Sequence, residues 1–146
     1  MATALGGRVK LSAGTARAAA LDAACIALFV LAGELSHGIS PVAEPLVALD
    51  TAIPFYVGWL VAATVGGAYA PRARATPRRA VTFAVLPWAV AVTIAQALRA
   101  TAVFHGDAAL SFAVVSLLVG GTLLAGWRLL STDAVRGRLR AVVPVG

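Results

Sequence analysis

The chain has 146 residues, of which 60% are hydrophobic and only 12% are charged. Ordinary soluble domains carry about 45–50% apolar and about 25% charged residues, and a soluble chain this short could not bury so much apolar surface. The net charge of +6 would suit a nucleic-acid binder. However, the arginines flank apolar runs without interleaved aromatic residues, which indicates contact with anionic lipid headgroups and no nucleic acid. Composition therefore predicts a single membrane domain over 1–146.

Charge alternates along the chain as expected for a protein that crosses the bilayer four times. Eleven of the twelve basic residues lie in three stretches, 8–17, 72–79 and 128–140, and the gaps between these stretches carry acidic residues. Because short cytoplasmic loops are enriched in Lys and Arg, both termini are expected in the cytoplasm. The predicted fold is all-α, a polytopic bundle of four transmembrane helices in the cell (cytoplasmic) membrane.

The first span is expected at 18–38, directly after the basic segment that ends at Arg17. A basic start followed by a short apolar core also describes a signal peptide. Asp22 at the start of the core and the missing A-x-A pattern favour a helix that is retained.

The other spans are separated by short polar segments. They are expected at 52–70, 80–98 and 109–127, with a basic cytoplasmic loop at 71–79 and a cytoplasmic tail at 128–146. Pro54 is expected in the first turn of its helix, where a missing N–H matters little, and Pro87 is expected to kink the third span. The tail is too short for a fifth span and could lie on the membrane surface.

Two adjacent residues at the end of the fourth span are predicted membrane anchors. Trp127 is expected at the level of the headgroups, and the guanidinium of Arg128 is expected to reach lipid phosphates.

Charged residues inside spans are costly and are therefore candidates for function. On a helical wheel, His37 and Glu34 lie about 60° and about 120° from Asp22, so all three share one side of the first helix. Asp22 is a candidate carboxylate at the inner side. It could relay protons, but capping its helix or pairing with Arg17 or Arg128 is favoured.

A polar cluster is expected near the outer ends of the first and third helices. Arg99 is the one basic residue outside the basic stretches, and its predicted partner is Glu34, with Asp107 as the second choice. Gln96 and His37 would complete the hydrogen bonds. A role in locking helices together is favoured over a role in binding a transported ion or substrate.

Neither a metal site nor catalysis is indicated. The pair Glu34-x-x-His37 has the spacing of di-iron helix bundles, but such sites need a second motif and two further glutamates. No nucleophile, zinc or phosphate-loop motif is present in the sequence. We expect no cofactor, no metal and no enzymatic activity.

Small residues in the second and fourth spans predict close helix packing. Gly58 lies in the second span, and Ser116-x-x-x-Gly120 in the fourth forms a small-x-x-x-small pattern. This pattern leaves open whether the packing occurs within one chain or between chains.

Several short segments suggest a family. They are Leu21-Asp22, Gly33-Glu34-Leu35-Ser36-His37-Gly38, Ile53-Pro54-Phe55-Tyr56-Val57-Gly58-Trp59, Leu98-Arg99, Ser111-Phe112-Ala113-Val114-Val115 and Gly126-Trp127-Arg128. With these segments the chain resembles a family of small four-helix integral membrane proteins of unknown function, common in haloarchaea and actinobacteria. The resemblance implies an integral membrane protein and supplies no activity. It also implies a basic residue where this chain has Glu34, so it does not support a Glu34–Arg99 pair as a family feature.

Two functions are consistent with these features. The leading hypothesis is a small transporter-like or permeation protein that acts as a homo-oligomer, because four short helices enclose little space alone. The alternative is a structural or accessory subunit of a membrane complex, in which the intramembrane charges serve helix packing only.

Overall fold

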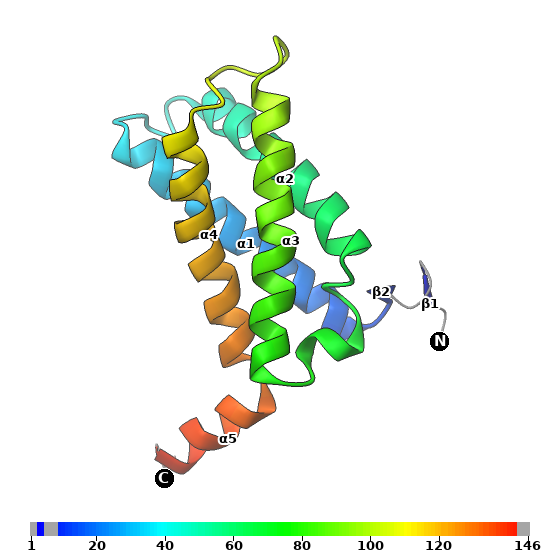
Figure 1. The fold of residues 1–146 in the computed structure, drawn as a ribbon. Helices are drawn as coiled ribbons and strands as arrows, with labels where there is room; N and C mark the ends of the chain where they lie inside the picture. Colours follow the sequence, from blue (N-terminus) through cyan, green and yellow to red (C-terminus); the bar gives the residue numbers. More distant parts are fainter. Residues whose placement is uncertain (1–2, 5–8, 143–146) are drawn as a thin grey trace.

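The computed structural model describes residues 3–4 and 9–142, and the part of the chain that it describes is dominated by helices (Figure 1). Four helices are long: α1 (Ala13–Ser36), α2 (Pro45–Val65), α3 (Pro77–Arg99) and α4 (Leu110–Leu130). The shorter elements are β1 (Thr3–Ala4), β2 (Val9–Lys10), the 3-10 helix η2 (Pro71–Arg74) and α5 (Asp133–Val142). β1 and β2 pair antiparallel. The predicted all-α fold is confirmed. Arg8, in the first basic stretch, and residues 143–146 of the predicted tail lie outside the described residues.

Each of the four long helices is long and apolar enough to cross a membrane, with a mean hydropathy between 1.7 and 1.9 over its most apolar window. Local signals explain where these helices begin. The Ser12 hydroxyl accepts a hydrogen bond from the Thr15 backbone N–H at 3.1 Å and caps α1, and the Thr76 hydroxyl caps α3 in the same way. Pro45 occupies the first turn of α2, where its missing N–H matters little.

Both ends of α2 differ clearly from the sequence prediction. Since α2 begins at Pro45, Pro54 lies in the interior of the helix and not in its first turn. α2 also ends at Val65, five residues before the predicted end. There Gly67 adopts a φ of +73°, and the Ala68 N–H donates to the Ala63 carbonyl at 2.9 Å, which is the glycine-terminated turn that commonly ends helices. This turn directs residues 68–70 back into the protein.

The four long helices form a ring in which each packs against two neighbours. α2 packs against α1 and α3, and α4 packs against α3 and α1. α1 and α3 are therefore diagonal partners, and Figure 1 shows α1 passing obliquely behind α3. α5 extends away from the end of α4 at the same end of the bundle where α1 begins.

Aromatic side chains fill the centre of the bundle. Phe55 lies 5.1 Å from Phe29 in an edge-to-face arrangement and 5.7 Å from Trp88 in a stacked one, as measured between ring centroids. The Trp88 indole N–H donates to the Ser116 carbonyl at 2.9 Å. Such aromatic pairs contribute about 0.5–1.5 kcal/mol each beyond the area they bury. Aromatic side chains therefore fill the space between the helices at the middle of the bundle.

The predicted small residues permit close approach within the chain. A Cβ atom at Gly58 would lie 2.4 Å from the Ala91 carbonyl oxygen, so α2 meets the backbone of α3 there. A Cβ atom at Gly120 would lie 2.3 Å from the Trp88 ring. Gly120 of the Ser116-x-x-x-Gly120 pattern therefore packs against α3 of the same chain. α3 continues as one helix through Pro87.

Candidate functional site

Polar side chains gather at the two ends of the bundle. The inner cluster consists of Asp22, Tyr69, Trp127 and Arg128, near the start of α1 and the end of α4. The outer site is formed by Gln96 and Arg99 at the end of α3. The aromatic core lies between them.

The inner cluster is built on an ion pair between the first and the last long helix. The Arg128 guanidinium contacts the Asp22 carboxylate with two nitrogens, Nη2 to Oδ2 at 2.6 Å and Nε to Oδ1 at 3.1 Å. Both side chains are inaccessible to solvent, with exposed fractions of 0% for Asp22 and 1% for Arg128. This two-pronged geometry is the strongest form of a charge-assisted hydrogen bond between side chains.

Further donors saturate the carboxylate. The Tyr69 hydroxyl donates to Oδ2 of Asp22 at 2.8 Å, and the Trp127 indole N–H donates to Oδ1 at 2.9 Å. Each carboxylate oxygen thus accepts two hydrogen bonds. The remaining guanidinium nitrogen, Nη1 of Arg128, donates to the Ala68 carbonyl at 2.9 Å. Each nitrogen and oxygen of the two charged groups therefore has a hydrogen-bond partner within the protein.

Aromatic rings enclose the guanidinium. The centres of the Trp59, Tyr69 and Trp127 rings lie between 5.5 and 5.8 Å from the guanidinium carbon of Arg128. The Trp59 indole N–H donates to the Tyr69 hydroxyl at 3.0 Å, which orients that hydroxyl toward Asp22. Burial raises the pKa of Tyr69, and the adjacent Asp22 carboxylate raises it further. The phenol therefore stays protonated and acts as a donor.

Of the roles predicted for Asp22, pairing with Arg128 is the one that the geometry provides. Asp22 does not cap α1, because that helix begins at Ala13 and Ser12 caps it. The predicted anchoring of Arg128 in lipid phosphates is wrong, because its guanidinium turns inward to Asp22. Trp127 is half-buried and donates to the same carboxylate.

The sequence did not indicate that Tyr69 and Trp59 belong to this cluster. Tyr69 follows Gly66-Gly67, and this glycine pair was the available signal, because glycine commonly ends a helix and would place Tyr69 beyond it. The backbone of Tyr69 also forms an isolated parallel β-bridge with Val9, near the start of the described chain.

The outer site contains buried polar atoms that lack hydrogen-bond partners among the described residues. Arg99 is 9% exposed and its guanidinium carbon lies 4.7 Å from the centre of the Phe112 ring. Gln96 donates through Nε2 to the Ala109 carbonyl at 3.1 Å. Within 9–142, Nε and Nη1 of Arg99 and Oε1 of Gln96 are buried without a hydrogen-bond partner. Such orphaned polar atoms are rare in folded proteins.

Arg99 does not pair with either of its predicted partners. Among the described residues neither Glu34 nor Asp107 forms an ion pair, although Glu34 is buried. Glu34 is on α1 and Arg99 is on α3, which are diagonal in the ring. His37 is exposed at the end of α1 and does not complete the cluster.

Asp50 binds the outer loop between α3 and α4. The Asp50 carboxylate accepts a hydrogen bond from the His105 backbone N–H at 2.8 Å, and the His105 imidazole lies 3.5 Å from the same oxygen. Gly106 follows with a φ of +113°, and a Cβ atom there would lie 2.3 Å from Nη2 of Arg99. The loop thus covers Arg99 closely.

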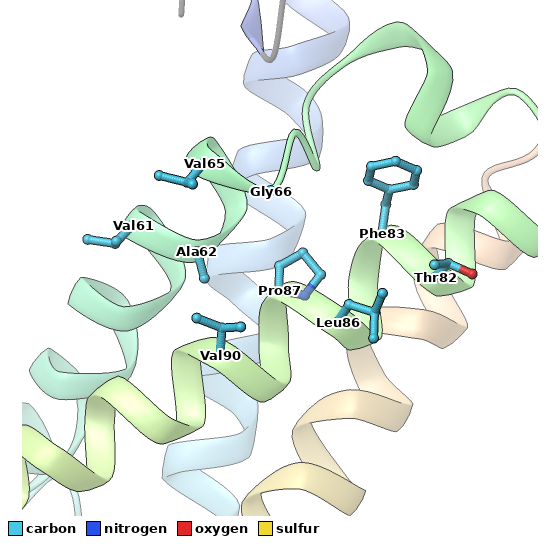
Figure 2. A pocket seen from close by; sticks show the side chains of 9 residues that line it. All are labelled: Val61, Ala62, Val65, Gly66, Thr82, Phe83, Leu86, Pro87 and Val90. Carbon is cyan, nitrogen blue, oxygen red and sulfur yellow. The ribbon is translucent and has the colours of Figure 1, made fainter.

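An apolar groove of about 350 Å³ opens between the end of α2 and the first half of α3 (Figure 2). Figure 2 shows Ala62 and Val90 pointing toward one another across it, with Pro87 close to Gly66. Thr82 supplies the one polar side chain of its lining, so the groove offers little chemistry for a polar ligand. Over the described part of the chain, no group of three or more His, Cys, Asp and Glu side chains could hold a metal ion.

Comparison with known proteins places the chain in a family without providing an activity. No curated protein and no solved structure shows significant similarity to it. The family model described as a protein of unknown function (DUF3054) matches residues 19–131, from α1 to the end of α4. The match includes Asp22, Tyr69, Trp127 and Arg128. The chain therefore belongs to the DUF3054 family.

Proposed function

We propose that this protein is an accessory subunit of a membrane complex, a closed four-helix scaffold that acts through its outer surfaces. In this proposal its buried charges serve helix packing, and the chain carries no catalytic activity. The observation that supports it most directly is the saturation of the Asp22 carboxylate by four hydrogen bonds from Tyr69, Trp127 and Arg128. A carboxylate that relays protons or binds cargo needs a free lone pair or access to water, and Asp22 has neither.

The packing of the centre gives further support. Phe29, Phe55 and Trp88 fill the space between the inner cluster and the outer site. Gly120 lies against the Trp88 ring on the α4 side. Water or an ion would have to displace this tightly packed cluster to cross a single bundle.

The proposed location is the cell (cytoplasmic) membrane, with the inner cluster at the cytoplasmic end. The basic side chains of η2 and α5 lie at this end of the bundle, as the positive-inside rule predicts for cytoplasmic segments. A reporter that is active only in the periplasm, fused after Arg140, should be inactive. Strong reporter activity would overturn this orientation.

Two measurements test the accessory role. Purified protein in liposomes should conduct protons and chloride no faster than protein-free liposomes. In native membranes, a photo-crosslinking residue at the lipid-facing position Leu60 or Leu118, which are 66% and 65% exposed, should give one discrete heteromeric product. Measurable flux together with crosslinks to lipid alone would contradict the proposal.

A transporter-like homo-oligomer is the second candidate, and the state of Arg99 favours it. A buried guanidinium with two unpartnered nitrogens can bind a small anion, and intramembrane charges commonly mark ion pathways. If this function holds, the wild type carries chloride or phosphate across liposomes, and Arg99→Gln loses that flux while remaining folded. Arg78→Gln, at an exposed position in the first turn of α3, is the matched control and should keep it. Absence of flux in the wild type would remove this candidate.

A further inference from the structure

A basic pocket lies at the inner end of the bundle, beside the inner cluster, with which it shares Trp127. It is a cavity of about 200 Å³ where α1, η2, α4 and α5 meet. Three arginines line it, together with apolar side chains that include Leu21 and Trp127. None of the lining residues is acidic.

The three arginines come from three separate elements. Arg17 belongs to α1, Arg74 to η2 and Arg136 to α5. Arg74 is held in place because its Nη1 donates to the Gly14 carbonyl at 3.0 Å. Among the described residues, none of the three forms an ion pair. Three unpaired cations around one small cavity repel one another, and a bound anion would relieve that repulsion.

The arginines that line the pocket suit a phosphate group. Guanidinium groups bind phosphate oxygens with paired, charge-assisted hydrogen bonds. Leu21 is 38% exposed and Trp127 is half-buried, and both add an apolar wall beside the arginines. A phospholipid headgroup presents the same combination of phosphate and adjoining apolar chain. Basic pockets between membrane helices on the cytoplasmic side are known sites for anionic lipids.

α5 has the character of a helix that lies in the membrane interface. No residue of α5 is buried, and Val135, Leu139 and Val142 recur at the spacing that places them on one face. Arg136 and Arg138 flank this face, at about 100° and about 60° on either side of Val135. Such helices lay their apolar face in the headgroup region and extend arginines to phosphates. An α5 that lies in this way would hold Arg136 at the depth of the headgroups.

We propose that this basic pocket binds a phosphate group, supplied either by an anionic phospholipid headgroup of the adjacent leaflet or by a soluble phosphate. The inference takes from the proposed function only that this end of the bundle faces the cytoplasm. Binding can be measured in micelles, where the protein has no sidedness, so its failure is distinguishable from failure of the topology or of the accessory role.

The test compares two charge-matched double variants of the full chain in neutral detergent. Arg17→Gln/Arg136→Gln removes two pocket arginines, and neither guanidinium forms an ion pair with the described residues. Arg78→Gln/Arg79→Gln removes two exposed arginines outside both the lining and α5, and lowers the net charge equally. The probes are phosphatidylglycerol, phosphatidylcholine and inorganic phosphate. Binding is measured by native mass spectrometry, and the thermal unfolding midpoint of each variant shows whether it is folded.

The wild type should bind phosphatidylglycerol in preference to phosphatidylcholine. The pocket variant should lose about ten-fold or more in affinity, because it removes two charged donors to the phosphate, whereas the control variant should stay within about two-fold. Phosphatidylglycerol binding that inorganic phosphate does not displace assigns the site to lipid, and binding of inorganic phosphate alone assigns it to a soluble ligand. Equal losses in both variants, or no binding of either probe, would overturn the proposal. If the double variant fails to fold, Arg136→Gln on the exposed α5 gives the same comparison.

Discussion

Nη2 of Arg128 lies 2.6 Å from Oδ2 of Asp22, and this contact joins α4 to α1 at the inner end of the bundle. The two helices are neighbours in the ring. Because lipid tails are as apolar as the helix surfaces, apolar burial alone gives little preference for one helix arrangement in a membrane. The ion pair therefore selects which faces of α1 and α4 meet.

Asp22→Asn should destabilise the protein by about 3–5 kcal/mol, because it leaves the Arg128 guanidinium buried without a counter-charge. Arg128→Gln should have a comparable effect, since it leaves the carboxylate uncompensated. The free energy of unfolding in mixed detergent micelles is the measurement. The double change Asp22→Leu/Arg128→Met should recover a large part of the loss, because replacing both charges by apolar groups leaves no unpaired charge. Losses below about 1 kcal/mol for both single variants would argue against a structural lock.

Tyr69→Phe should remove one donor to Asp22 at a cost of about 1.5–3 kcal/mol and should also change the alkaline limit of stability. The pKa of Tyr69 is raised in the folded state by burial and by the Asp22 carboxylate. Between the unfolded and the folded pKa the native state therefore binds more protons, so the wild type should lose stability as the pH rises above about 10. Unfolding free energies from about pH 9 to about pH 11 should fall less steeply for Tyr69→Phe. Identical slopes would contradict the placement of this phenol.

Gly120→Ala should destabilise the protein by about 1–3 kcal/mol, because the new methyl group overlaps the Trp88 ring and the core must shift. Gly126→Ala is the matched control on the same helix. A Cβ atom at Gly126 meets nothing within 4 Å, so this change should be neutral or stabilising by up to about 1 kcal/mol. Thermal unfolding of the two variants in detergent provides the comparison. Equal effects would show that Gly120 does not govern the contact between α3 and α4.

Gly106→Ala should lower the stability of the outer loop by about 1–3 kcal/mol, because a φ of +113° is strained for any residue with a Cβ atom. The added methyl group would also press on the Arg99 guanidinium. Hydrogen exchange should report faster opening of residues 101–109 while the inner half of α3 remains protected. Unchanged exchange in the loop would contradict the close cover of Arg99.

The helices could be predicted from the sequence because hydropathy and charge alternation reflect the bilayer directly. The positions of their ends depended on finer signals. The second span was predicted to run to residue 70, but the Gly66-Gly67 turn ends α2 at Val65, and only this early end brings Tyr69 inward. Hydropathy alone does not separate a buried loop from the last turn of a helix.

The candidate site was only partly predictable, since side-chain pairing depends on the order of helices around the ring. Asp22 and Arg128 lie on neighbouring helices, so their pairing could be proposed from their shared position near the inner end. Glu34 and Arg99 share the outer end as well, but α1 and α3 are diagonal and the two residues do not pair. The sequence indicates how far along its helix a charged residue lies, but it does not indicate which helices are neighbours in the ring.

Asp22 and Arg128 lie far apart in the sequence, so Asp22 is synthesised long before its partner. Asp22 is on the first of the four long helices, and Arg128 follows 106 residues later at the end of the last one. During synthesis a chain with three inserted helices therefore holds a carboxylate without its counter-ion, a state that only the arrival of α4 ends. A chain that lacks α4 therefore keeps the Asp22 carboxylate without its guanidinium partner, and its first three helices are not expected to form a stable bundle on their own.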